Sequence, residues 1–282
     1  MSMNRAWTGG VIAAAAWIGV AAAPAIAQQR AVIRELNSHA TVDTSEDAKS
    51  YKLVFDAYLD MSEPDFDLGG RVTAYSVHPD MPNWDEVSAW AESNVHLADA
   101  ILAVRSRNTI VIGLPYGRDN VSSEYREAGL FVDIGSSGSL REISFPYLDA
   151  VNDVAAFVTA EAYRRFEAGE PEAAVDLTVA HLVWLRQLAD RDFVDEKLYG
   201  IDLLSISLSN MRDMAYLYME EMSPDLLRRV SLDEIPFLRP DRSRLFMPEA
   251  DRIVSQALIK EVFDEASGQA DPTMFRQVFG AI

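Results

Sequence analysis

Cysteine is absent from all 282 residues of the chain. Thiol catalysis, cysteine-ligated zinc and disulfide bonds are therefore excluded, and packing must supply the stability of the fold. Basic residues are also scarce, with 25 Lys and Arg against 44 Asp and Glu and a formal net charge of −19. Such a charge repels nucleic acid and anionic membranes, so we expect no nucleic-acid partner.

Motifs for familiar chemistries are missing as well. The four histidines show no H-x-x-x-H or H-x-H spacing, no G-x-S-x-G is present, and the GSSG of residues 135–138 lacks the lysine of a P-loop. Residues 190–201 begin like a calcium loop but lack its central glycine and final glutamate. His181 lies on an apolar stripe with Leu177 and Trp184, which favours a core or boundary histidine over a ligand or base. We therefore expect no cofactor and no metal site.

Long apolar runs are confined to the N-terminus. Arg5 is the only charged residue among the first 27, and the run VIAAAAWIGVAAA of residues 11–23 follows it. Ala25 and Ala27 form an A-x-A pattern ahead of Gln28. The pattern predicts a signal peptide over residues 1–27, cleaved after Ala27, and a periplasmic or extracellular protein with no membrane span after cleavage. An uncleaved N-terminal anchor is the alternative.

Residues 28–282 are predicted to form a single, mainly helical domain, with a division near residue 140 as the alternative. Residues 28–44 are polar and mixed, which indicates a loose lead-in. Apolar spacing predicts a helix over residues 46–61 with Ser45 as its cap, and a second from Asn83 to about Arg105. Two β-like runs follow, at residues 109–114 and 129–135, and predict either a small hairpin or two extended connections.

The helical signal strengthens after Pro146. Helices are predicted over residues 147–168 and 171–190, joined by a short turn in which Gly169 caps the first helix and Pro171 begins the second. A third is predicted over residues 195–222, with a narrow apolar seam formed by Ile201, Leu204, Leu208, Met211, Ala215, Tyr218 and Met222. These patterns indicate a mainly α fold of antiparallel helical hairpins, packed as a bundle or a short repeat-like array, with a small β-like insertion near residues 109–135.

The C-terminal part of the chain is more broken. Pro224, Pro236 and Pro240 indicate a looser region. Further helices are predicted over residues 248–266 and 271–279, the first beginning at a proline.

The hairpin around Gly169 resembles a tetratricopeptide repeat. Ala162 and Ala174 stand where that repeat has small residues, but Val158 replaces its large aromatic residue, His181 replaces a small one, and no second copy follows at a period of 34 residues. Residues 161–191 also resemble the glycine-centred hairpins of uncharacterised secreted helical proteins of planctomycete-type bacteria. This resemblance implies a helical, exported protein and no particular substrate or catalytic residue.

Two functions remain open. Arg239, Arg242, Arg244 and Arg252 cluster in an acidic chain and form a candidate binding site for a carboxylate or phosphate, with pairing to Asp241, Glu249 and Asp251 as the structural alternative. Hairpin helices present binding faces, so we expect a protein- or peptide-binding or scaffold protein of the cell envelope, with a protein or peptide as partner. The alternative is an envelope-polymer hydrolase that uses paired carboxylates, drawn from the acids of residues 195–221. No catalytic residue is assigned.

Overall fold

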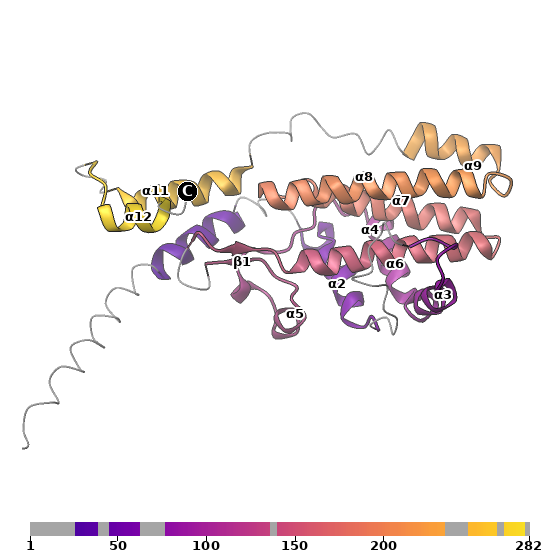
Figure 1. The fold of residues 1–282 in the computed structure, drawn as a ribbon, viewed down its shortest axis with the longest axis horizontal. Helices are drawn as coiled ribbons and strands as arrows, with labels where there is room; N and C mark the ends of the chain where they lie inside the picture. Colours follow the sequence, from indigo (N-terminus) through magenta and orange to yellow (C-terminus); the bar gives the residue numbers. More distant parts are fainter. Residues whose placement is uncertain are drawn as a thin grey trace, which may run out of the picture.

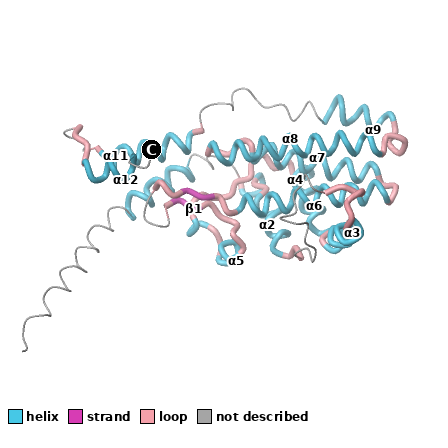
Figure 2. Tube along the Cα trace, in the orientation of Figure 1, coloured by secondary structure: helices cyan, strands magenta, loops and turns pink. Residues whose placement is uncertain are grey.

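The computed structural model describes residues 26–38, 45–62, 77–135, 140–234, 248–263 and 268–279. As predicted, the protein is mainly helical, and its helices pack against one another (Figure 1). The described residues contain one small sheet of two antiparallel strands, seen beside the long helices in Figure 2.

Three long helices form the central layer of the molecule. They are α6 (Tyr147–Glu167), α7 (Pro171–Leu188) and α8 (Val194–Leu217), which lie side by side in Figure 1. Helix α7 packs against both α6 and α8. The shorter helices α2 (Tyr51–Leu59), α3 (Trp84–Ser93) and α4 (Val95–Ser106) cover this layer, with α4 on α7, α3 on α6 and α2 on α4.

The remaining elements lie around this layer. The first half of the chain also contains two short 3₁₀ turns, η1 (Glu46–Ala48) and η2 (Arg118–Asn120), and the short helix α5 (Ser123–Glu127). Helix α9 (Pro224–Arg229) continues into the π-helical turn η3 (Val230–Glu234), and α11 (Glu249–Val262) packs against α12 (Pro272–Phe279). In Figure 1, α9 lies at one end of the long helices, and residues 26–38, α11 and α12 lie at the other.

The turn between α6 and α7 is built as the sequence predicts. Gly169 has φ of +76°. Its N–H donates to the Phe166 carbonyl at 2.9 Å, and the Glu170 N–H donates to the Arg165 carbonyl at 2.8 Å. This pair of bonds is the Schellman motif, which satisfies the last carbonyls of a helix and needs a left-handed residue. Pro171 then begins α7, where its missing N–H costs nothing.

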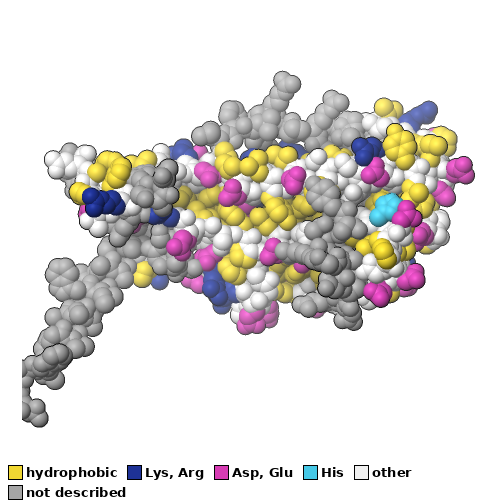
Figure 3. Space-filling model, viewed as in Figure 1, with side chains coloured by type: hydrophobic (Ala, Val, Ile, Leu, Met, Phe, Trp, Pro, Cys, Tyr) yellow, Lys and Arg dark blue, Asp and Glu magenta, His cyan; other side chains and the backbone are white. Residues whose placement is uncertain are grey.

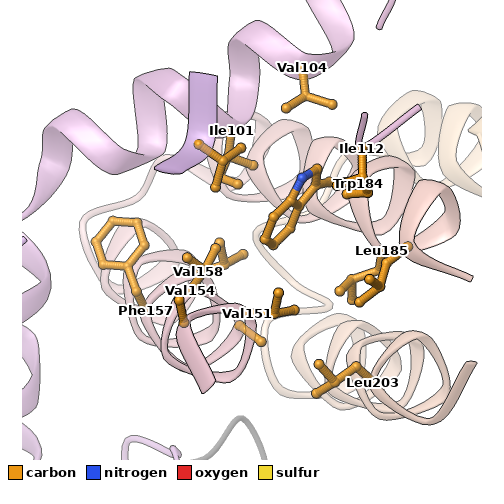
Figure 4. Packing of buried hydrophobic residues seen from close by; sticks show 14 of the residues in the cluster. Ile101, Val104, Ile112, Val151, Val154, Phe157, Val158, Trp184, Leu185 and Leu203 are labelled. Atoms are coloured by element: carbon orange, nitrogen blue, oxygen red, sulfur yellow. The ribbon is translucent and has the colours of Figure 1, made fainter. Parts of the chain in front are cut away.

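The hydrophobic core lies between the two layers of helices. Figure 4 shows the Trp184 side chain of α7 among Ile101 and Val104 of α4 and Val151 and Val158 of α6. One contiguous cluster of buried hydrophobic residues extends from Val32 to Ala257. Helix α6 is buried on most of its circumference, which is typical of a helix enclosed by others.

The predicted loose lead-in is wrong for most of its length. Residues 26–38 are helical, and Val32 and Leu36 are buried in the core. Asn37 fixes this helix, because its side-chain amide donates to the Tyr116 carbonyl at 2.9 Å and accepts from the Tyr116 N–H at 2.8 Å. Gln28 and Gln29 also donate to the carbonyls of Ala257 and Ile134, so the helix is held by bonds to distant parts of the chain, which its polar composition did not indicate. Residues 39–44 lie outside the described part.

Two predicted helices are each broken by a buried polar residue. The one over residues 46–61 becomes η1 and α2, because Lys49 forms a bridge with Val111 and the buried Ser50 hydroxyl donates to Gln187 Oε1 at 2.7 Å. The one from Asn83 is divided at Asn94, whose fully buried side chain accepts from the Ser62 N–H and donates to the Trp90 carbonyl. Neither predicted cap residue makes a side-chain cap bond.

The β-like runs are extended but do not form a hairpin with each other. Strand β1 (Asp133–Ile134) pairs antiparallel with β2 (Ile143–Ser144), which was not predicted. Val111, in the run of residues 109–114, forms a parallel bridge with Lys49. Tyr116, just after that run, forms a separate parallel bridge with Val132. The first run therefore pairs with a segment about 60 residues away, and β1 pairs with a strand of 2 residues that begins nine residues after it ends and is too short to show an alternating pattern.

The seam predicted on α8 is partly wrong. Met211 is buried, but Ile201 is 45% exposed. The buried stripe instead contains Gly200 and Ser207, and a Cβ on Gly200 would lie 2.7 Å from the backbone nitrogen of Ala189. Gly200 thus lies where α8 closely approaches the end of α7, and a count of apolar positions overlooks both it and the buried Ser207. Helix α8 also ends at Leu217, five residues before the predicted end.

The other boundaries agree within a few residues. Helix α6 ends one residue before the predicted position, and α7 ends two residues before it. The region predicted as loose contains α9 and η3, while residues 235–247 lie outside the described part.

Candidate binding pocket

An apolar pocket of about 260 Å³ lies at the α9 end of the central layer. Its walls come from the C-terminal end of α6, the N-terminal half of α7, the second half of α8, and the chain that returns through α9. The lining residues are Phe166, Val175, Thr178, Leu208, Met211, Arg212, Met214, Ala215, Met222, Leu227 and Val230.

The return of the chain after α8 builds this pocket. Ser223 caps α9, since its hydroxyl accepts from the Leu226 N–H at 3.1 Å, and Pro224 begins the helix. Leu226 is buried. Arg229 donates from Nη2 to Asp176 Oδ1 at 2.7 Å, which ties α9 to α7. The capped turn and the ion pair therefore hold α9 beside the long helices and leave the pocket between them.

The pocket interior offers little hydrogen bonding to a ligand. The Thr178 hydroxyl already donates to the Ala174 carbonyl at 2.9 Å, and Arg212 Nη2 lies 2.8 Å from Asp213 Oδ1. Met211, Met214 and Met222 contribute flexible, polarisable side chains. Methionine-rich apolar surfaces adapt to partners of varied shape. Leu208, Ala215 and Leu227 are only half-buried, so the pocket reaches the surface.

Aromatic rings support the pocket from the α6 side. Phe166 stacks on Tyr218 with ring centroids 4.7 Å apart and planes at 5°, and Tyr163 lies edge-on to Trp84 at 6.2 Å. Burial, with smaller contributions from nearby carboxylates, raises the pKa of Tyr163 and of Tyr218 to about 12. Both phenols therefore stay neutral at physiological pH and act as packing and hydrogen-bonding groups.

The surface around the pocket combines apolar and acidic side chains. Tyr216, Leu217, Met219 and Leu232 are between 52% and 74% exposed. Acidic side chains lie nearby. A second hollow, of about 360 Å³, lies beside the Gly169 turn, and its lining includes Glu170, Glu172 and Glu221. Hydrophobic and acidic side chains also lie together at this end of the molecule in Figure 3. The carboxylates of the rim therefore attract cations, and the pocket lining is uncharged apart from Arg212, which pairs with Asp213.

The apolar seam predicted on α8 contains part of this pocket, although the sequence did not identify it as a pocket. Leu208, Met211, Ala215 and Met222 belong to the predicted seam of α8, and all four line the pocket. The contribution of α9 was missed, because the prolines of residues 224–240 suggested a loose region. The Ser-Pro pair at residues 223–224 was the available signal, since Ser before Pro is typical of a helix start.

The predicted arginine cluster is largely outside the described residues, which do not include Arg239, Arg242 or Arg244. Arg252 lies on α11, at the end of the molecule opposite to α9 in Figure 1. Its Nε donates to Glu249 Oε2 at 2.8 Å and its Nη1 to Gln256 Oε1 at 2.7 Å. Asp251 accepts from the Val194 N–H at 2.8 Å. Arg252 thus pairs with Glu249, whereas Asp251 binds a backbone N–H, and the role of the cluster as a whole stays a prediction.

The acids proposed for a hydrolase do not share one environment. Asp195, Asp202, Asp213, Glu220 and Glu221 are exposed, whereas Glu196 is fully buried. Glu196 accepts from the Tyr147 hydroxyl at 2.5 Å, from the Tyr116 hydroxyl at 3.1 Å and from Arg191 Nε at 2.9 Å. This carboxylate is held in an internal network by two phenols and a guanidinium.

None of the three histidines that the structure describes lines the pocket. His181 is 1% exposed, as its apolar stripe predicts, and its Nε2 atom has no hydrogen-bond partner. Burial lowers its pKa from 6.5 to about 3, so the ring is neutral at physiological pH. His96 Nε2 lies 3.1 Å from the Ala57 carbonyl, and His78 accepts from the Asp80 N–H at 3.1 Å. Among the described residues, no group of three or more His, Asp or Glu side chains is placed to hold a metal ion.

Comparisons with known proteins identify no relative: a scan of family models, a search of curated proteins and a search of solved structures each found no match to this chain. No helix in the described ranges is long and apolar enough to cross a membrane.

Proposed function

We propose that this protein is an exported binding or scaffold protein that takes an apolar segment of a partner protein into the pocket between α7, α8 and α9. The observation that carries the proposal is a methionine-lined apolar pocket that reaches the surface and is bordered by exposed apolar side chains. An apolar surface of this kind, rimmed by polar residues, is typical of a protein-interaction site.

The chemistry of the rim defines the partner more closely. Glu220 and Glu221 are exposed beside the lining residue Met222, and Asp225 follows on α9. Carboxylates around an apolar groove favour a ligand that carries apolar residues on one face and Lys or Arg on the other. The partner segment is therefore a basic amphipathic helix, whose apolar residues recur at positions i, i+3, i+4 and i+7.

Fluorescence anisotropy with a synthetic peptide tests this function. The probe is a labelled helical peptide of about 14 residues with Leu at the four apolar positions and Lys elsewhere. The control peptide replaces Lys by Glu and keeps every Leu. We expect the Lys peptide to bind and the Glu peptide to bind at least about tenfold more weakly, with the difference shrinking at high salt.

Two pairs of variants locate the site. Ala215→Trp fills the pocket, whereas Ser205→Trp places the same side chain at an exposed position on the same helix. Glu220→Lys with Glu221→Lys reverses the rim, and Asp195→Lys with Asp202→Lys makes the same charge change at the other end of α8. The proposal is supported if the Ala215 variant and the Glu220 and Glu221 double variant lose binding while the two control variants keep it. Equal binding by all four, or equal affinity for both peptides, contradicts it.

A further inference from the structure

A third hollow, of about 1,060 Å³, lies at the opposite end of the molecule from the apolar pocket. One wall is the helix of residues 26–38, and the facing wall is formed by residues 117–120 and strand β1. In Figure 1 this helix lies beside β1, far along the long axis from α9. We call this hollow the arginine groove, because Arg30, Arg34 and Arg118 line it.

Fixed contacts hold both walls of the arginine groove. Gln29 donates to the Ile134 carbonyl at 2.6 Å near one end of the helix, and Asn37 forms its two bonds with the Tyr116 backbone near the other. Asn120 donates to the Tyr116 carbonyl at 2.6 Å and fixes the opposite wall. The groove is therefore part of the folded framework, and its shape is set before any ligand arrives.

Within the part of the chain that the structure describes, the three arginines of the groove form no ion pair, whereas several other arginines do. Arg164, Arg186 and Arg229 each lie within 2.7 Å of a carboxylate oxygen. Within the described ranges, no ion pair is formed by Arg30, Arg34 or Arg118, and all three side chains are exposed. The Arg118 guanidinium lies 5.3 Å from the centroid of the Phe131 ring, a cation–π contact that limits its orientations.

The arginine groove carries a net positive charge, whereas the protein as a whole is strongly acidic. Two acids, Asp119 and Asp133, also line the groove, so its walls carry three cationic against two anionic side chains. The whole chain has 25 cationic against 44 anionic residues. Arg30 and Arg34 are four residues apart on one helix, which places both guanidinium groups on the same face. Each guanidinium presents a planar fork that fits a carboxylate or a phosphate.

We propose that the arginine groove is a binding site for a multiply charged organic oxyanion, with Arg30, Arg34 and Arg118 as its ligands. The volume exceeds what a single inorganic anion fills, and Ile33 and Ile134 supply apolar wall for the body of an organic molecule. Phosphate and carboxylate groups share the geometry that a guanidinium binds, so the ligand class is defined by that shared chemistry. The site is separate from the pocket proposed for the partner helix, and it does not depend on that function.

Isothermal titration calorimetry with citrate and with inorganic pyrophosphate, each at low ionic strength, tests this site. We expect at least one of the two probes to bind the full chain. Binding of citrate alone assigns a carboxylate ligand and binding of pyrophosphate alone assigns a phosphate ligand. The double variant Arg30→Gln, Arg34→Gln is expected to weaken binding about tenfold or more, because it removes two charge-assisted contacts. Arg118→Gln should weaken it independently.

The matched control is the double variant Arg107→Gln, Arg228→Gln. Both residues are exposed and lie outside the groove, Arg107 directly after α4 and Arg228 on α9, and their loss changes the net charge equally. Circular dichroism of each variant verifies the fold. Unchanged affinity in the control, with loss in the groove variants, supports the site. Equal weakening in both double variants, or no binding of either probe by the wild-type chain, overturns it.

Discussion

At the scale of single residues, the buried network around Glu196 joins three separate parts of the chain. Tyr147 comes from α6, Tyr116 from the segment before η2, and Arg191 from the turn between α7 and α8. The Arg191 guanidinium also donates to the Leu114 carbonyl at 2.8 Å and lies 4.2 Å from the centroid of the Tyr116 ring. Burial raises the pKa of both phenols well above the usual value, so they remain hydrogen-bond donors.

Removing the charge of Glu196 should therefore be strongly destabilising. Glu196→Gln leaves Arg191 buried without its counter-ion, and we expect a loss of about 3 kcal/mol in the free energy of unfolding. Urea unfolding measures it. Asp195→Asn, at the exposed neighbouring position, should change stability by less than about 0.5 kcal/mol. Similar losses in both variants would show that the network does not contribute as described.

His181 should make stability depend on pH below neutrality. Its folded-state pKa of about 3 lies below the usual 6.5, so the unfolded chain takes up a proton first as the pH falls. The stability that this residue contributes is therefore fully present well above pH 6.5 and declines towards pH 3, by about 1.6 kcal/mol between pH 6.5 and 5. Unfolding free energies at those two pH values, in wild type and His181→Leu, measure this contribution. An identical pH slope in both proteins would contradict it.

Single residues were predictable where local spacing decided their environment. His181 was placed in the core by the apolar positions three and four residues away, and its burial confirms this. Glu196 looked like any other acid of a charged helix, because Tyr116 and Tyr147 are 80 and 49 residues away in sequence. Long-range hydrogen bonds of this kind leave no local pattern.

At the scale of elements, the α6–α7 hairpin depends on one backbone conformation. A Cβ added to Gly169 would meet no atom within 4 Å, yet the residue has φ of +76°. Any cost of substitution here therefore comes from the left-handed backbone and not from packing.

Substitutions at Gly169 should separate these two causes. Gly169→Ala is expected to lower the free energy of unfolding by about 1 kcal/mol, because alanine disfavours the left-handed region. Gly169→Asn should lower it less, since asparagine adopts that conformation more readily. Chemical denaturation of both variants measures the difference. A larger loss with asparagine would indicate that side-chain size, and not φ, decides.

Elements were predictable where local capping and apolar periodicity agree. The boundaries of α6 and α7 follow from Gly169, Pro171 and a helical run on each side. Asn94 divides α3 from α4 through its bonds to Ser62 and Trp90, and β1 pairs with a strand that begins nine residues after it ends. Those features arise from tertiary contacts, which override local preference.

At the scale of the whole molecule, the two proposed sites have opposite chemistry and lie at opposite ends. The apolar pocket has an acidic rim, and the arginine groove has three exposed cations. The mainly α class was predictable from composition and periodicity. Of the two sites, only the α8 side of the apolar pocket was predictable, because the other walls come from segments that are distant in sequence.

The proposed export predicts that the N-terminal 27 residues are removed from the chain. Cleavage after Ala27 would keep Val32 and Leu36, the buried anchors of the helix of residues 26–38. It would remove Ile26 and Ala27 from the wall of the arginine groove, leave its three arginines in place, and put a new ammonium group at Gln28 beside them. Intact-mass spectrometry of protein exported by a bacterial host should give a chain of residues 28–282. Ala25→Leu with Ala27→Leu should block processing, because the cleavage site requires small residues. A wild-type chain that retains Met1 would contradict the prediction.

The central claim is that a basic amphipathic helix enters the pocket between α7, α8 and α9. Nuclear magnetic resonance of ¹³C-labelled methionine methyl groups, during titration with the Lys–Leu peptide, tests it most directly. Met211, Met214 and Met222 line the pocket, whereas Met61 lies beyond the end of α2 and serves as an internal control. We predict that the three pocket signals shift together and saturate while the Met61 signal stays in place. Pocket signals that do not move at saturating peptide, or that move no more than Met61, would contradict the account.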